Sequence, residues 1–128
     1  MNNAEALKWY YKAAEQGVAE AQFILGLDYK RGEGGVKKDF AKGAEWYRKA
    51  AEQGHMYALY NLAVCYEYGE GVPKDKETAI KLYQKAAEQG CTDAEKDVKR
   101  LEGGGLGSAV AAGAALAGAG LIWKFLNS

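Results

Sequence analysis

The chain has 128 residues with 17 basic and 17 acidic side chains, so its formal net charge at pH 7 is zero. This balance argues against a nucleic-acid binder or a binder of anionic lipid, because both need a basic surface. One His, two Cys and one Pro leave little material for a metal site or a disulfide framework. Nine Tyr, three Trp and three Phe instead favour a packed helical core over disorder.

A ten-residue sequence recurs three times along the chain. It reads KWYYKAAEQG at Lys8–Gly17, EWYRKAAEQG at Glu45–Gly54 and KLYQKAAEQG at Lys81–Gly90. Its spacing of 37 and then 36 residues is typical of solenoids, in which short helical units stack and share a core. The repeat therefore predicts a chain built from similar units, each with two helical stretches.

Two kinds of helix are expected to alternate from the N-terminus. Apolar residues at helical spacing predict first-type helices over residues 19–31, 56–68 and 92–101, and the first two of these are rich in Ala, Leu and Tyr. The decapeptide ends each second-type helix, the first of which is predicted over residues 4–16. Asp39 and Asp75 are expected to cap the next two, while Gly32 and Gly69 end the first-type helices in the left-handed conformation. The predicted buried residues of these two second-type helices are Ala44, Tyr47, Ala50, Ala51, Ile80, Tyr83, Ala86 and Ala87.

The linker GEGVPKD at Gly69–Asp75 and the helix end WYRKAAEQG at Trp46–Gly54 resemble the Sel-1-like repeat family, a relative of the tetratricopeptide repeats. The resemblance covers about residues 4–101. It implies an antiparallel α/α solenoid whose members act as adaptors and scaffolds for other proteins, and it brings no catalytic residues. The first linker departs from the pattern, with an extra Gly and with Lys37 where Pro73 stands in the second, which predicts a looser turn.

The two ends of the predicted solenoid differ. The helix over residues 92–101 has the polar outer face of a terminal cap. The helix over residues 4–16 instead carries Leu7, Trp9, Tyr10 and Tyr11 around much of its circumference, and no first-type helix is predicted before it. Three interpretations stay open: the chain is a piece of a longer solenoid, its C-terminal segment folds back over this edge, or the terminal helix of another copy stacks on it head to tail, as in a filament.

A second domain is predicted at residues 103–128, after the solenoid of residues 1–102. It consists of a Gly hinge and a Gly/Ala-rich hydrophobic helix with no charged residue from Leu106 to Ile122. As a helix this run reaches about 26 Å, close to the length that spans a bilayer. Small residues every four positions favour close helix packing, and aromatic and cationic residues at its end suit a membrane interface. The residues predicted for packing or membrane contact are Gly105, Ala109, Gly113, Ala117, Trp123 and Lys124.

No catalytic, metal-binding or cofactor-binding residue is predicted. His55 has no metal-ligating neighbour at suitable spacing and is interpreted as a surface or capping residue, and the two cysteines lack a nearby base. Binding to a protein partner remains. In the first-type helices, positions that differ between the copies while their neighbours match are free to contact a partner on the concave side. These candidates are Ile24, Asp28, Arg31, Asn61, Cys65 and Tyr68.

The sequence thus predicts a non-enzymatic protein-interaction scaffold that associates with a membrane through residues 106–126. The alternative is a self-assembling subunit that forms filaments by half-repeat stacking and packing of the C-terminal helix. A weaker alternative is a secreted membrane-active polypeptide. No secretory signal is visible, because the first apolar run is short and flanked by charges, so an intracellular location is expected.

Overall fold

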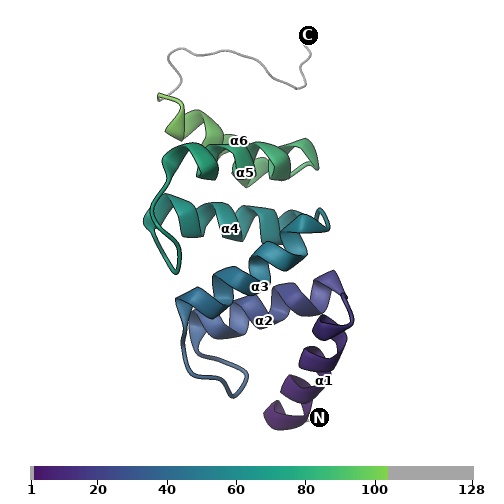
Figure 1. Cartoon of the computed structure of the whole chain (residues 1–128). Helices are drawn as coiled ribbons and strands as arrows, with labels where there is room; N and C mark the ends of the chain where they lie inside the picture. Colours follow the sequence, from purple (N-terminus) through teal and green to yellow (C-terminus); the bar gives the residue numbers. More distant parts are fainter. Residues whose placement is uncertain (1, 104–128) are drawn as a thin grey trace. The chain divides into compact units, whose positions relative to one another are not determined.

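The computed structural model describes residues 2–103, and within them it contains six helices and no strand (Figure 1). The helices are α1 (Asn3–Glu15), α2 (Ala19–Arg31), α3 (Phe40–Glu52), α4 (Met56–Tyr68), α5 (Lys76–Glu88) and α6 (Thr92–Leu101). The predicted all-α repeat architecture is confirmed, and α2, α4 and α6 begin and end at the predicted residues. All predictions for Gly105, Ala109, Gly113, Ala117, Trp123 and Lys124 lie outside the described residues.

The chain divides into two compact units, residues 1–79 and 80–128, and each is described by itself. The first unit contains α1 to α4 and the start of α5. The second contains the rest of α5 and α6. The predicted domain boundary at Gly103 lies at the edge of the described residues and stays a prediction.

Short polar contacts fix where the helices begin and end. Gly32 and Gly69 have φ of 70° and 71°, in the left-handed region that a helix C-terminus uses. The Asp39 carboxylate accepts the Lys42 N–H at 3.1 Å, which confirms Asp39 as the N-cap of α3. Asp75 likewise accepts the Thr78 N–H at 3.2 Å.

The two linkers that follow first-type helices close with the same hydrogen bond despite their different lengths. The Asp39 N–H donates to the Tyr29 carbonyl at 2.8 Å, and the Asp75 N–H donates to the Tyr66 carbonyl at 2.8 Å. The extra residue of the first linker therefore lies between two fixed ends.

The core of the first unit rests on a close approach between α2 and α3. Tyr47 is fully buried, and an ideal Cβ placed on Gly26 would lie 2.5 Å from two Tyr47 ring atoms. Gly43 lies against the same part of α2, since a Cβ on it would lie 3.0 Å from the Gly26 carbonyl oxygen. The two helices reach this separation because both contact positions lack a side chain. The Phe23 ring packs beside Tyr47 with centroids 6.0 Å apart.

A second cluster joins α1 to α2 and α3. Leu25 is fully buried in it, and Leu7, Tyr10, Tyr11, Ala13 and Trp46 pack around its buried members. The Tyr11 ring meets the edge of Trp46 at 5.9 Å, and its hydroxyl shares a hydrogen bond with that of Tyr29. Aromatic side chains from three helices thus fill the space beside the small alanines.

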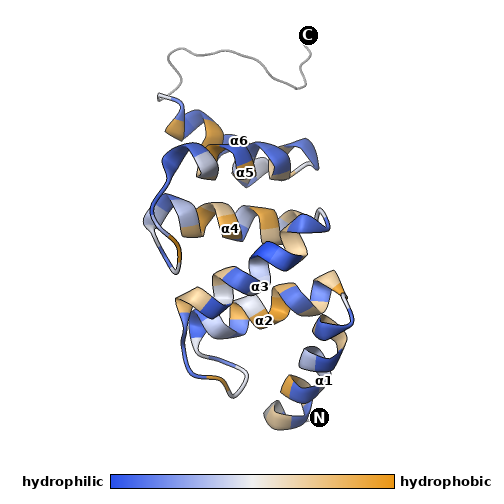
Figure 2. Cartoon of the chain, viewed as in Figure 1, coloured by the Kyte–Doolittle hydropathy of each residue, from blue (hydrophilic) through white to orange (hydrophobic). Residues whose placement is uncertain are grey.

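In the second unit, Tyr83, Ala86, Cys91 and Ala94 are buried. The predicted polar outer face of α6 is confirmed for the charged residues at positions 95, 96, 99 and 100, which are exposed, whereas Asp97 is half-buried. Figure 2 shows these hydrophilic residues on α6 and the more apolar run along α4. The predicted burial was wrong for Ala51, Ile80 and Ala87, which are only half-buried.

We expect Gly26→Val to lower the free energy of unfolding by about 2–3 kcal/mol, because a branched side chain would overlap the Tyr47 ring and force the helices apart. Urea unfolding followed by circular dichroism measures this change. Lys81→Val, at an exposed helical position, is the matched control, with an expected change within about 0.5 kcal/mol. Equal unfolding midpoints for the two variants would show that α2 and α3 do not depend on this approach.

Candidate functional site

The structure exposes two of the six predicted partner-binding residues, leaves three half-buried and buries one. Arg31 and Tyr68 are exposed, and Tyr68 retains 61% of its accessible surface. Ile24, Asp28 and Asn61 are half-buried. Their role in binding stays a prediction.

Cys65 is a correction to the predicted set. Its side chain is only 2% exposed, so it cannot offer its thiol to a partner. The reason is its position on the side of α4 that enters the core, where the thiol interacts electrostatically with the buried Tyr47 hydroxyl.

The solvent-facing stripe of the first-type helices follows the spacing i, i+4, i+7, i+11, which keeps four residues on one face of a helix. We call this surface the α2–α4 face. It consists of Glu20, Ile24, Leu27 and Arg31 on α2 and of Tyr57, Asn61, Val64 and Tyr68 on α4. None of these eight residues is buried. Glu20, Leu27, Tyr57 and Val64 were not predicted for this face. Glu20 and Tyr57 lie one turn before the predicted Ile24 and Asn61. Leu27 and Val64 follow the same two residues at helical spacing, so the spacing was a signal for all four.

Asp28 lies at the edge of this face rather than in it. An ideal Cβ on Gly34 would lie 2.6 Å from the Asp28 Oδ2 atom, so the carboxylate packs against the first linker. Partial burial, followed by the nearby Glu33 carboxylate, raises the pKa of Asp28 above its usual value.

His55 joins the two helices where the face begins. Its ring stacks on Phe23 of α2 with centroids 4.8 Å apart, and its Nε2 lies 2.9 Å from the Glu20 carboxylate. Its Nδ1 accepts the Ala58 N–H at 3.1 Å, which confirms the predicted capping role. Because Nδ1 accepts, the neutral ring donates through Nε2. Tyr57 lies beside this pair, 6.1 Å from each ring.

Two glutamines, Gln22 and Gln53, form hydrogen bonds near the start of α2, beside His55 and Glu20. Gln22, buried to 5% exposure, donates to the Ala14 carbonyl at 3.0 Å. Gln53 donates to the Gln22 side-chain oxygen at 3.0 Å and to the Gly17 carbonyl at 2.8 Å. These bonds connect the ends of α1 and α3 to α2, so the start of the face is held by a connected polar network.

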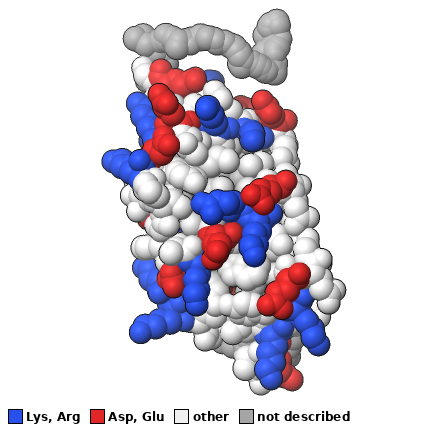
Figure 3. Space-filling view, in the orientation of Figure 1, with Lys and Arg blue, Asp and Glu red and all other residues white. Residues whose placement is uncertain are grey.

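The second-type helices carry a charged outer surface. Its residues are exposed, and they are Lys42, Arg48, Lys49, Lys81 and Lys85. Figure 3 shows basic and acidic side chains interspersed on the face in view, without a large area of one sign. This mixture agrees with the balanced composition and differs from the basic stripe of a nucleic-acid binder.

Among the described residues, the buried Cys65 thiol and Tyr47 hydroxyl are poor nucleophiles. Burial raises the pKa of the Cys65 thiol from 9.0 to about 11, which keeps it protonated at neutral pH. Burial also raises the pKa of Tyr47 above its ordinary range. Within residues 2–103, no three His, Cys, Asp or Glu side chains gather in a group that could hold a metal ion. In that same range, no helix has the length and apolar character needed to cross a bilayer.

Comparison with known proteins confirms the predicted resemblance. The sequence model of the Sel1 repeat matches residues 2–18, 19–55 and 57–91. A Sel1 repeat protein from Oxalobacter formigenes is 42% identical, with a TM-score of 0.75 over 77% of this chain and 74% of that chain. Helicobacter pylori cysteine rich protein B is 30% identical, with a TM-score of 0.72 over 76% of this chain and 72% of that chain. A search of the curated proteins gave no match.

A third similar structure is c5321, a protective antigen of uropathogenic Escherichia coli strains that displays an SLR fold. It is 42% identical, with a TM-score of 0.73 over 75% of this chain. This chain spans only 20% of the length of that protein. Together these structures confirm the α-solenoid fold class.

His55→Ala should lower the free energy of unfolding by about 1–2 kcal/mol, because it removes the cap on Ala58 as well as the ring stacked on Phe23. His55→Asn restores a capping oxygen without the ring and should recover part of this loss. Urea unfolding of the three proteins separates the cap from the stacking. If His55→Asn were no more stable than His55→Ala, the cap would contribute nothing.

The raised pKa of Cys65 predicts a loss of stability in alkali. Between about pH 9 and pH 11 the unfolded thiol loses its proton while the folded thiol keeps it, so its contribution to folding falls as the pH rises. We expect the stability difference between the native protein and Cys65→Ala to be constant below pH 8.5 and to shrink toward pH 10.5. Urea titrations across this range measure it, and a difference independent of pH would contradict the assignment.

Proposed function

The chain belongs to the Sel1 repeat family, whose members are generally non-catalytic protein-interaction scaffolds, and we propose that it binds its protein partner through the α2–α4 face. The observation that carries this proposal is the exposure of two aromatic rings on one stripe of α4. Tyr57 and Tyr68 retain 56% and 61% of their accessible surface.

The composition of the face suits a protein partner. Tyrosine is enriched among the residues that dominate binding energy at protein interfaces, because it combines a large apolar ring with a hydroxyl. Ile24, Leu27 and Val64 supply aliphatic surface between the polar ends of the face. Asn61 donates to the Tyr57 carbonyl at 2.8 Å, so its amide is held in one orientation with its oxygen available as an acceptor.

The face is also held rigid where it begins. His55 and Gln22 tie the starts of α2 and α4 to their neighbours, so a partner meets a surface that needs little ordering. Preformed surfaces of this kind lose less side-chain and backbone freedom on binding. The residues that vary between repeats then decide which partner is accepted.

The finer predictions from the sequence remain proposals. Membrane association and filament assembly through the C-terminal segment depend on residues 104–128, which lie outside the described residues. The intracellular location and the weaker alternative of a secreted membrane-active polypeptide are proposals of the same standing. Flotation of the full chain with liposomes tests the membrane proposals.

We expect Tyr68→Ala to weaken partner binding about 30-fold, the loss that truncation of an interface aromatic residue typically causes. The experiment recovers proteins from an extract with the immobilised native chain and then measures the affinity of each recovered protein for the variants. Lys49→Ala, on the outer surface of α3, is the control and should leave affinity unchanged. A partner that responds to Lys49→Ala and ignores Tyr68→Ala would place the binding surface on the second-type helices instead.

A further inference from the structure

The start of α4 differs from the starts of the other two first-type helices. α2 and α6 begin at the same repeat position, which Val18 and Cys91 occupy, and neither side chain forms a cap hydrogen bond. His55 occupies this position before α4, and its Nδ1 atom accepts the Ala58 N–H at 3.1 Å. Of these three helix starts, α4 is therefore the one with a titratable cap.

This cap depends on the protonation state of the ring. A neutral imidazole accepts a hydrogen bond through one nitrogen and donates through the other, whereas a protonated imidazole donates through both. The Nδ1 atom of His55 can therefore accept from Ala58 only while it lacks a proton. Imidazole side chains take up their second ring proton between about pH 8 and pH 5. A modest fall in pH thus exchanges an acceptor for a donor at this atom.

The surroundings of the ring hold one charged contact. Glu20 of α2 places a carboxylate oxygen 2.9 Å from the ring Nε2 atom, and its side chain is 67% exposed. Phe23 of α2 stacks on the ring at 4.8 Å, and the uncharged Tyr57 of α4 lies 6.1 Å away. α3 ends with the exposed carboxylate of Glu52, three residues before the histidine. These are the titratable groups to weigh against the cap.

A second ring proton removes more from this junction than it adds. The Glu20 carboxylate already accepts from the neutral ring, so the proton adds charge to an existing contact, whereas it removes the Ala58 bond outright. A side-chain cap generally contributes more to stability than an ion pair with an exposed carboxylate, because water screens the pair. The positive end of the α4 dipole also repels a charged ring. The native chain therefore favours the neutral ring.

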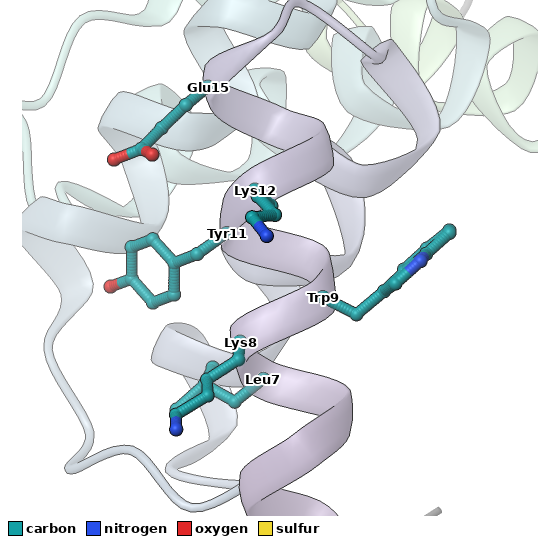
Figure 4. A pocket seen from close by; sticks show the side chains of 6 residues that line it. All are labelled: Leu7, Lys8, Trp9, Tyr11, Lys12 and Glu15. Carbon is teal, nitrogen blue, oxygen red and sulfur yellow. The ribbon is translucent and has the colours of Figure 1, made fainter.

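The charged residues beside α1 lack this coupling. Figure 4 shows Lys8, Lys12 and Glu15 around a hollow on this helix, with Trp9 pointing away from Tyr11. The two lysines and the glutamate come from one helix and are exposed. An exposed charge on a single helix gains or loses its proton without separating two helices. The ring of His55, by contrast, lies between α2 and α4.

The cap holds the beginning of the α2–α4 face. Tyr57 is the second residue of α4, and Glu20 begins the face on α2, so both lie beside the ring. The Leu59 N–H donates to the backbone carbonyl of His55 at 2.9 Å. The ring takes no part in that bond, so α4 stays helical when the cap opens. The change is confined to the first turn and to the two face residues beside it.

We propose that His55 is a pH-sensitive cap, and that proton uptake by its ring breaks the bond to Ala58 and releases Tyr57 and Glu20 from their positions at the start of the α2–α4 face. The consequence for binding rests on the function proposed above. A partner bound through this face is then released as the pH falls toward about 5.

NMR of the ¹⁵N-labelled full chain tests the proposal, and the ring signals are unambiguous because the sequence has a single histidine. We expect the neutral ring to carry its hydrogen on Nε2, and the Ala58 amide shift to follow the ring titration between about pH 7.5 and pH 5. The protection of the Ala58 amide against hydrogen exchange should fall about 5-fold over this range. A ring that titrates without a change at the Ala58 amide, or a neutral ring with its hydrogen on Nδ1, would overturn the proposal.

Urea unfolding provides a second measurement with a matched control, His55→Asn, which keeps a capping side chain that does not titrate. Because the native state favours the neutral ring, the unfolded chain binds more protons and stability falls as the pH falls. Between about pH 7.5 and pH 5, the unfolding constant of the native chain should rise about 5-fold more than that of His55→Asn. Glu20→Gln, which removes the compensating charge, should enlarge this difference. An equal or smaller rise in the native chain would show that the Glu20 contact outweighs the cap, and the proposal would fail.

A binding experiment separates the pH effect from the proposed function. Proteins recovered by the immobilised native chain at about pH 7.5 are bound in parallel to immobilised His55→Asn, and both samples are brought to about pH 5.5. We expect release from the native chain and retention on His55→Asn. Equal release from both chains would contradict control of the face by the cap. Recovery of no protein, or full retention on Tyr68→Ala at pH 7.5, would count against the proposed function, while the NMR titration still decides whether the cap opens.

Discussion

The separation of α2 and α3 is the constraint on which the first unit depends. Tyr47 is a large side chain in a fully buried position, and it fits only because Gly26 and Gly43 have no side chains at the crossing. Close packing of this kind tolerates little change in volume, because protein interiors are filled to the density of organic crystals. The rotation of α2 about its own axis follows from this contact, and the rotation decides which of its residues meet solvent.

That rotation produces the candidate binding surface. A first-type helix with one side against a second-type helix leaves a single stripe for solvent, and on α4 this stripe runs from Tyr57 to Tyr68. The core side uses residues that recur between α2 and α4, such as Leu25 and Leu62. Stability and recognition are therefore assigned to different sides of one helix, so the exposed stripe can change from repeat to repeat without altering the packing.

Local signals made most of the fold predictable from the sequence. The ends of α2 and α4 depend on glycines with positive φ, and the start of α3 depends on a cap from Asp39, all of which act within a few residues. The site was less predictable, because exposure at a helix edge depends on contacts with distant residues. Asp28 and Cys65 occupy the same repeat position, yet one carboxylate packs on a linker and the other side chain enters the core. The junction around His55 depends on Glu20 and Phe23, which lie more than thirty residues earlier, and no spacing rule in the sequence points to it.

The linkers Gly32–Asp39 and Gly69–Asp75 differ in length by one residue, which indicates how the loops of a repeat array can change without changing its helices. In both repeats the aspartate that begins the second helix is bound to a tyrosine carbonyl of the first, at 2.8 Å in each case. The entropy of closing a loop grows only slowly with its length, so a residue inserted between these anchors changes the loop while leaving the helices in register. Gly35 shows the result, since this extra residue takes the left-handed conformation with φ of 93°, while Gly34 at 70° matches Gly71 of the shorter linker at 78°. Insertions at these loops therefore offer the array a way to gain new surface determinants that is independent of the helices, and they are natural sites for grafting a foreign peptide.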